Sequence, residues 1–211
     1  MAEISDTLRL VELTCARLCH ELSGLAGTLG NVIDLAVEEA PAAAETLVVG
    51  RDAARELVQR LRLLRAAWGP DSMPLALSAL LALAQGRQNA ARIRIDSSAL
   101  PAETIFSPRM SRLILNLILL ASECLPGGGI VSLAGSAADV IIMISGPKAA
   151  WPMGFAGCLA DEATAFAALT GARALQMPLT ALLTHGLGLR LSMLMAPGAD
   201  RGAPPLRLEG K

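Results

Sequence analysis

Apolar residues along the first 36 positions recur with the spacing of a helix that buries one seam. The steps between them alternate three and four, which is the heptad rhythm of helices packed along a single stripe. The members of this seam are Leu8, Val11, Cys15, Leu18, Leu22, Leu25, Leu29, Val32 and Ala36. The pattern predicts a helix that begins near Ser5 or Asp6, both suitable N-caps, and ends near Glu39, before Pro41.

A second helical stretch follows the turn around Pro41 and is predicted to end at Trp68, before Gly69 and Pro70. Its apolar positions keep the same rhythm, and they are Leu47, Gly50, Ala54, Leu57, Leu61, Leu64 and Trp68. Two long antiparallel helices cannot bury both seams completely in each other. The sequence therefore predicts a helical hairpin over residues 1–69 that dimerises into a four-helix bundle. The less favoured alternative is that the rest of the chain covers the hairpin. It is less favoured because the apolar pattern of the rest is expected to form a separate core of its own.

His20 occupies the heptad position opposite the predicted seam, so we expect its ring to face water. The same outer face carries small residues, namely Ser23, Gly24, Gly27, Gly30 and Asn31. Each glycine inside a helix costs about 1 kcal/mol relative to alanine. Two explanations stand: another element of this chain packs closely there, or a helix of another protein approaches closely. The second is favoured, because these positions point away from the seam.

After a linker at residues 69–74 the pattern changes and predicts a small α/β sandwich over residues 74–211. Helices are predicted at residues 75–83, 108–125, 161–169 and 175–184. Strands are predicted at residues 91–96, 130–134, 140–145, 187–195 and 206–208, the last of them at an edge. Helices grouped on one face of a mixed sheet, behind a helical hairpin, give an α+β fold class.

Composition excludes several classes of function. The net charge is only −1, there is no tyrosine and aromatic content is 2%, which argues against nucleic-acid binding. Mean hydropathy is +0.51, but charged residues and Pro-Gly clusters interrupt every apolar run before the length of about 18 residues that a membrane span needs. The acidic start lacks the basic region of a signal peptide, so we expect a cytoplasmic protein without membrane contact. The cysteines lack zinc-site spacing and are expected to be reduced, buried small residues: Cys15, Cys19, Cys124 and Cys158.

Two stretches resemble the motifs of sensor histidine kinases. Arg17–Leu22 resembles the H-box, in which the histidine carries a phosphoryl group and the next acidic residue assists as base. Leu113–Leu117 resembles the start of the N-box, and the order of elements after the linker is similar to that of the kinase ATP-binding domain. The nucleotide machinery departs from the pattern, however. Leu120 stands where a second asparagine binds magnesium, and Glu123 stands where a lysine is expected.

Other nucleotide motifs are also absent from this sequence. Ser145 and Gly146 replace the aspartate-glycine motif that reads adenine. The stretch Gly186–Leu189 imitates a glycine box, but we reject it because a helix is predicted before it and a strand after it. An H-box joined to a degenerate nucleotide domain resembles the ChpT-like histidine phosphotransferases over essentially the whole chain. Many such relatives have His-Asp and a nearby proline, whereas this chain has His20-Glu21 and glycines.

The resemblance implies a dimeric phosphorelay protein that passes a phosphoryl group through His20 between receiver-domain aspartates, downstream of a hybrid histidine kinase. It implies no ATP hydrolysis and no cofactor of its own, since the partner receiver supplies Mg²⁺. Glu21 orients the ring or is an ordinary flanking charge. We expect the partner-binding residues to be Arg17, Ser23, Gly24, Gly27, Asn31, Arg62 and Arg65. The alternatives are a non-catalytic dimeric adaptor that sequesters a receiver or kinase, and a divergent histidine autokinase. His185, the only other histidine, is expected to contact the terminal carbonyls of its helix.

Overall fold

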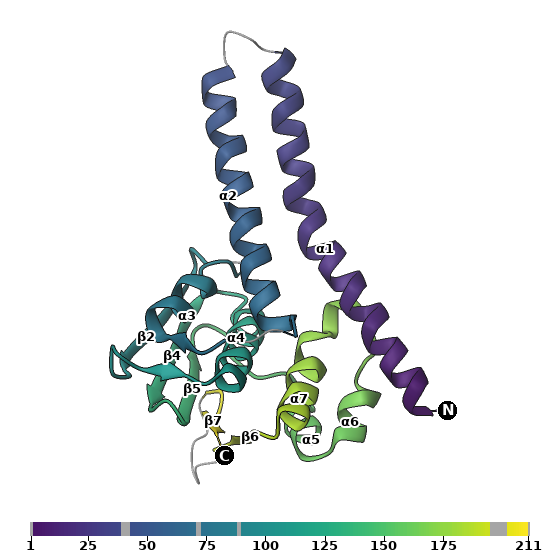
Figure 1. The fold of residues 1–211 in the computed structure, drawn as a ribbon, viewed down its shortest axis with the longest axis vertical. Helices are drawn as coiled ribbons and strands as arrows, with labels where there is room; N and C mark the ends of the chain where they lie inside the picture. Colours follow the sequence, from purple (N-terminus) through teal and green to yellow (C-terminus); the bar gives the residue numbers. More distant parts are fainter. Residues whose placement is uncertain (1, 39–42, 71–72, 88–89, 195–201, 211) are drawn as a thin grey trace.

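The computed structural model describes residues 2–38, 43–70, 73–87, 90–194 and 202–210. They form an α+β molecule in which a long helical hairpin stands on an α/β domain (Figure 1). The hairpin consists of α1 (Ala2–Glu38) and α2 (Ala43–Trp68). The predicted end of α2 is confirmed, and α1 begins somewhat earlier than predicted. No helix among the described residues is long and apolar enough to cross a membrane.

The two helices pack closely at Gly50 of α2. A Cβ atom there would lie 2.8 Å from Cγ1 of Val32 on α1, so a side chain larger than hydrogen would push the helices apart. The predicted seam of α2 is only partly correct, because Leu47 and Leu61 are exposed. The residues of α2 that are buried instead include Ala53, Arg60, Leu63 and Ala67. The reason is that the base of α2 also packs against α3 and α4 of the second domain, which turns its buried face.

The N-terminal half of α1 uses a different face from the one predicted. Leu13 belongs to the main core, whereas Leu8 is 57% exposed and Val11 is 53% exposed. This half of α1 contacts the one-turn helix η1 (Ala172–Ala174) of the second domain. The expectation that the rest of the chain leaves the hairpin uncovered is therefore wrong for this half. The heptad seam itself stays open to solvent here.

The sheet of the second domain is mixed, as predicted. Its five strands, in spatial order, are β2 (Ile93–Ala99), β4 (Gly129–Gly135), β5 (Asp139–Ser145), β7 (Leu206–Glu209) and β6 (Arg190–Met193). Only β2 and β4 run parallel. The prediction that residues 206–208 form an edge strand is wrong, because β7 pairs with β5 on one side and β6 on the other. Leu206 and Leu208 are fully buried, as suits an inner strand.

One face of this sheet is covered by helices. Alternate strand residues such as Val131, Val140 and Ile142 are buried in the core. The helices are α3 (Leu77–Ala84), α4 (Pro108–Glu123), α5 (Phe155–Ala160), α6 (Glu162–Ala167) and α7 (Gln176–Leu187). Three features were not predicted: α5, the one-turn helix η1, and a two-stranded sheet of β1 (Leu75–Ala76) with β3 (Ile105–Phe106).

The central helix α4 ties the domain to the hairpin. It starts as predicted, with the Ser107 side chain capping the backbone N–H of Met110 and Pro108 in the first turn. Nearly all of its residues are buried, because the helix contacts both α2 and α7. The end of the hairpin therefore rests directly on the core of the second domain.

Candidate functional site: an exposed histidine above a buried ion network

The ring of His20 is exposed on α1, as its heptad position predicts. His20 follows Leu13 by seven residues, which is roughly 20° short of two helical turns. His20 is nevertheless displaced around the helix from the residues that face the second domain at this level, by about 60° from Arg17 and about 100° from Glu21. The ring is open to solvent.

The glycine face beyond His20 is open as well. A Cβ atom added to Gly24, Gly27 or Gly30 would meet nothing within 4 Å. Ser23 and Asn31 are exposed, and the Ser23 hydroxyl donates a hydrogen bond to the carbonyl of Cys19 at 2.6 Å. Of the two explanations for these glycines, close packing by an element of the same chain finds no support in the described residues. The approach of another protein stays the favoured explanation.

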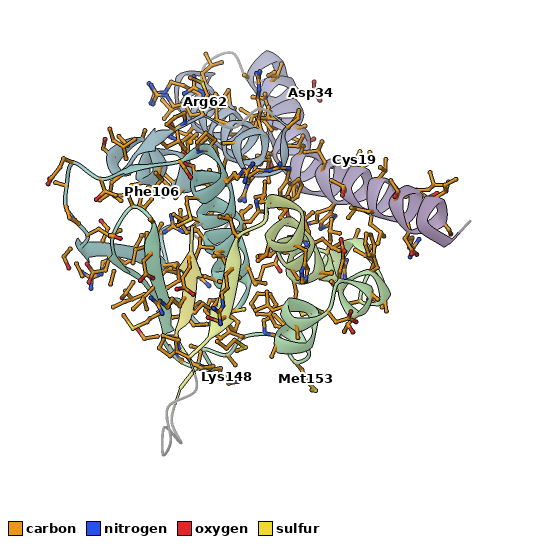
Figure 2. The ribbon with its side chains drawn as sticks, turned by 60° about the horizontal axis from the view of Figure 1, so that its bottom comes forward. Cys19, Asp34, Arg62, Phe106, Lys148 and Met153 are labelled. Carbon is orange, nitrogen blue, oxygen red and sulfur yellow. The ribbon has the colours of Figure 1, made fainter. Side chains whose placement is uncertain are left out.

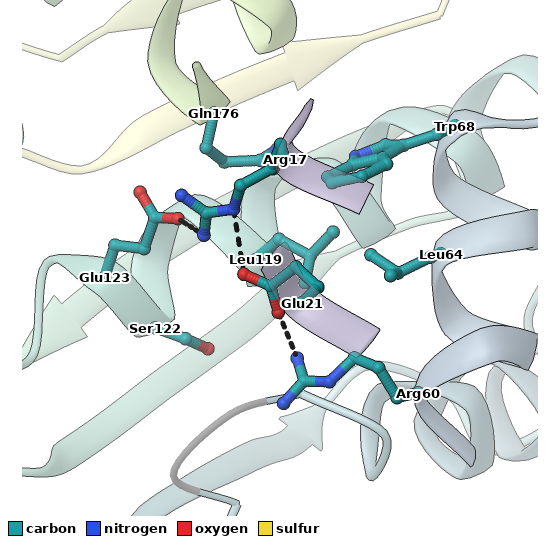
Figure 3. A pocket seen from close by; sticks show the side chains of 9 residues that line it. All are labelled: Arg17, Glu21, Arg60, Leu64, Trp68, Leu119, Ser122, Glu123 and Gln176. Carbon is teal, nitrogen blue, oxygen red and sulfur yellow. Dashed lines mark hydrogen bonds and ion pairs between the residues drawn. The ribbon is translucent and has the colours of Figure 1, made fainter. Parts of the chain in front are cut away.

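Glu21, the next residue in sequence, lies in the opposite kind of environment. It is 8% exposed, because one step along a helix turns the side chain by about 100°. Its carboxylate lies between two arginines, with Oε1 2.8 Å from Nε of Arg17 and Oε2 3.6 Å from Nη1 of Arg60 (Figure 3). The predicted role of Glu21 in orienting the His20 ring stays a prediction, but its carboxylate already serves as the centre of an ion network.

Arg17 joins this network to the second domain. Its Nη2 lies 2.7 Å from Oε1 of Glu123 on α4, and Nη1 donates to the carbonyls of Ala172 at 3.4 Å and Arg173 at 3.1 Å. The Arg17 side chain is only 13% exposed. Arg17, predicted as a partner-binding residue, is therefore engaged at the junction rather than displayed on the open face. Glu123, which departs from the kinase pattern, supplies its counter-charge.

The network borders a cavity of about 110 Å³ between hairpin and domain. It is lined by Arg17, Glu21, Arg60, Leu64, Trp68, Leu119, Ser122, Glu123 and Gln176. Burial raises the pKa of Glu123, an effect that the Arg17 charge opposes. Burial also lowers the pKa of Arg60, against the attraction of Glu21. These shifts mark charges that are partly desolvated, so each depends on its partner.

The N-box-like asparagine acts as a brace between three helices. Asn116 is fully buried, and its Nδ2 donates to the carbonyls of Ala67 at 2.7 Å and Arg112 at 2.9 Å. Its Oδ1 accepts a hydrogen bond from Nε2 of Gln176 at 3.1 Å. The amide oxygen that would coordinate a metal is thus already hydrogen-bonded. Within the described ranges, no group of three His, Cys, Asp or Glu side chains could hold a metal ion.

Arg62 and Arg65 are not brought together with His20. They line a second cavity, at the base of α2, to which no residue of α1 contributes. In Figure 2, Arg62 lies on the far side of α2 from Cys19, the neighbour of His20. The rejected glycine box is confirmed as a helix end, since Gly188 caps α7 with φ 63° and β6 follows.

Two smaller expectations need correction. Nε2 of His185 lies 3.0 Å from the carbonyl of Cys158, so this histidine contacts α5 rather than the end of its own helix. Cys15 and Cys19 are exposed, and only Cys124 and Cys158 are buried. The first pair lies on faces of α1 that the chain itself leaves open. Burial raises the pKa of Cys124 to about 12, so this thiol stays protonated.

Sequence reasoning missed most of the junction. Arg60, Trp68 and Gln176 lie far from Glu21 along the chain and meet only in the folded molecule. One signal was available, because Arg17 and Glu21 stand four residues apart on a predicted helix and so share a face. That spacing indicates that Glu21 can pair with Arg17.

Comparison with known proteins identifies the family and the fold. Residues 78–198 match the family described as histidine phosphotransferase C-terminal domain. A solved structure described as a bacterial phosphotransferase shares the fold, with 20% identity, 95% of each chain covered and a TM-score of 0.69. The cytoplasmic segment of histidine kinase QseC gives 18% identity over 79% of this chain and 92% of its own, with a TM-score of 0.38. Full-length ShkA in complex with AMPPNP gives 18% identity over 92% of this chain and 44% of its own, with a TM-score of 0.42. No curated protein matches the chain.

Proposed function

The chain belongs to the histidine phosphotransferase family, and on this premise we propose that His20 carries a phosphoryl group between the aspartates of response-regulator receiver domains. The observation that supports the proposal is the open ring of His20, followed by a glycine face on which a Cβ atom would meet nothing. An upstream hybrid histidine kinase would charge the first receiver. The relay consumes no ATP.

The chemistry requires one nucleophile from this chain. A ring nitrogen of neutral His20 attacks the phosphorus of an aspartyl phosphate, an N–P bond forms, and the P–O bond to the carboxylate breaks. The carboxylate leaves with the electron pair of that bond. In the second half, the carboxylate of another receiver attacks the phosphohistidine and the ring leaves. The receiver's acidic pocket would hold Mg²⁺, which would supply the positive charge that neutralises the phosphoryl oxygens in both halves.

The docking surface follows from the periodicity of α1. His20, Gly24, Gly27 and Asn31 are spaced by four, three and four residues, so they share one face over about three turns. Glycines allow the backbone of a partner helix to approach closely. A receiver that reaches His20 therefore docks along this face of α1.

The same proposal includes a homodimer. Large apolar side chains are exposed along the hairpin, on α1 at Ile4, Leu8, Val11, Leu18 and Ile33 and on α2 at Leu47, Val58 and Leu61. A stripe of this length is unusual on a monomer and fits the surface that a second copy covers in a four-helix bundle. His20 follows Val11 by nine residues, about two and a half turns, so its ring points away from this stripe. Dimerisation therefore leaves His20 accessible.

The decisive experiment mixes the protein with a receiver phosphorylated on aspartate with ³²P. We expect acid-labile label on this chain, none on the His20→Ala variant, and normal labelling of His185→Ala, which changes the only other histidine. A receiver that binds without transferring label supports the adaptor instead. Labelling by ³²P-ATP alone supports an autokinase.

A further inference from the structure

A second concave surface lies at the base of α2, away from His20. A cavity of about 300 Å³ opens between the last turns of α2, the start of the second domain and the first turns of α4. Its lining residues are Arg62, Arg65, Ala66, Met73, Leu75, Leu83, Ser111 and Arg112. The relay proposed above uses none of them.

The floor of this cavity is apolar. Ala66, Leu75 and Leu83 are partly buried and pack against the main core, but they keep a face toward the cavity. Met73 stands at the rim and is 72% exposed. Single exposed apolar residues are ordinary, but several of them around a concavity form the kind of surface that accepts an apolar side chain of a partner.

The charged residues that the structure describes at the rim of the cavity are all positive. Arg62 and Arg65 are exposed, and over the described ranges neither forms an ion pair and no acidic residue lines the cavity. By contrast, Arg51 and Arg55 on the same helix lie 3.5 and 3.6 Å from the carboxylate of Asp52.

Arg112 adds a third positive charge in the wall of the cavity. Its Nε and Nη2 donate to the carbonyls of Ala67 and Trp68, at 3.3 and 3.2 Å, which fixes its position. Three guanidinium groups above an apolar floor favour a ligand that carries both carboxylates and hydrocarbon.

We infer that this cavity binds a short acidic segment of a partner protein. The segment places an apolar side chain against Leu75 and Leu83, and its carboxylates pair with Arg62 and Arg65. A symmetric contact with a second copy would bring the same arginines face to face, and a flat membrane surface cannot enter a concavity. A nucleic acid would find no aromatic side chain for stacking among the lining residues.

The test uses the full chain and a short fluorescein-labelled peptide in which aspartate alternates with leucine. We expect saturable anisotropy changes that weaken as salt increases, and a loss of affinity of about tenfold or more in the Arg62→Glu, Arg65→Glu double variant. The matched control is Arg51→Glu with Arg55→Glu, which changes the same charge on the same helix and leaves binding unaltered. In ¹³C-methyl spectra, the Met73 signal shifts on titration.

Several results would overturn the inference. An equal loss in both double variants means unspecific attraction, and equal binding of a peptide with serine in place of leucine means that the floor is not used. Arg62- and Arg65-dependent sedimentation with phosphatidylglycerol vesicles, without peptide binding, assigns the surface to membranes. A change of oligomeric state in the Arg62→Glu, Arg65→Glu variant assigns it to a second copy. None of these results depends on His20, so failure here leaves the relay proposal standing.

Discussion

His20 and Glu21 are neighbours in sequence, yet they lie in opposite environments. The imidazole stands in solvent beside open glycines, and the carboxylate is buried between Arg17 and Arg60. One step of a helix separates the two, so the same helix exposes an imidazole in one direction and is anchored by a carboxylate in another. Along α1, the direction of a side chain rather than its position in the sequence decides whether it is exposed to solvent or buried in the ion network.

The largest effect on phosphoryl transfer is expected when the imidazole ring of His20 is removed. We expect His20→Ala to lower phosphoryl transfer by about a thousandfold or more, because no other described side chain on that face carries an imidazole. The free energy of unfolding should stay within about 0.5 kcal/mol, since an exposed side chain is lost. Transfer is measured with a ³²P-labelled receiver and stability by urea denaturation. A large loss of stability would contradict the exposed placement of the ring.

Removal of the Glu21 carboxylate should lower the stability of the fold. Glu21→Ala leaves Arg17 and Arg60 without their shared counter-charge in a buried site, and we expect a destabilisation of about 3 kcal/mol. The control is Glu12→Ala on the same helix, whose ion pair with Arg9 is exposed and long at 3.8 Å. That variant should change stability by less than about 0.5 kcal/mol. Equal effects of the two substitutions in urea denaturation would show that the network contributes nothing special.

The open glycine face can be compared with the closed one inside the hairpin. We expect Gly27→Ala to stabilise the protein by about 0.5–1 kcal/mol, because the new methyl meets nothing and helix propensity improves. Gly50→Ala should destabilise it by about 1–3 kcal/mol, because the methyl would lie 2.8 Å from Val32. Thermal unfolding measures both. If Gly27→Ala also weakens receiver binding, the glycine is retained for binding although it lowers the stability of the helix. Unchanged binding would show that Gly27 is not needed for docking.

The smallest expected effect is a dependence on pH at the junction. Burial raises the pKa of Glu123 above its ordinary value of 4.5 in the folded chain. Just above pH 4.5 the folded state therefore binds more protons at this group than the unfolded state, and its contribution to stability falls as pH rises through that window. Glu123→Gln should remove this component of the slope. Its side chain is 36% exposed, so the effect is modest, and an unchanged slope in urea titrations at several pH values would refute it.

Local patterns in the sequence were sufficient for much of the fold. The end of α2 at Trp68, the Ser107 cap of α4 and the hairpin of β4 and β5 all follow from signals within a few residues. The helix α5 was missed because its N-cap is Gly154 in a left-handed conformation, without a capping side chain. The inner position of β7 depends on which strands pair, and no spacing along the chain specifies that.

In the candidate site, too, some features follow from local sequence patterns and others depend on the folded chain. The exposure of His20 could be derived from heptad positions, because they refer to one helix alone. The junction around Arg17 could not, since Glu123 and the carbonyls near Arg173 reach α1 only after the domain has folded. The positions of Arg62 and Arg65 were also missed, because their neighbours come from β1, α3 and α4.

The hydrogen bond from Asn116 to the carbonyl of Ala67 has a mechanical consequence. It joins the end of α2 to the second domain, so a change in the tilt of the hairpin relative to this domain requires that a buried hydrogen bond be broken. In the proposed relay, every receiver therefore meets the hairpin and the second domain in the same relative orientation, which is fixed during folding.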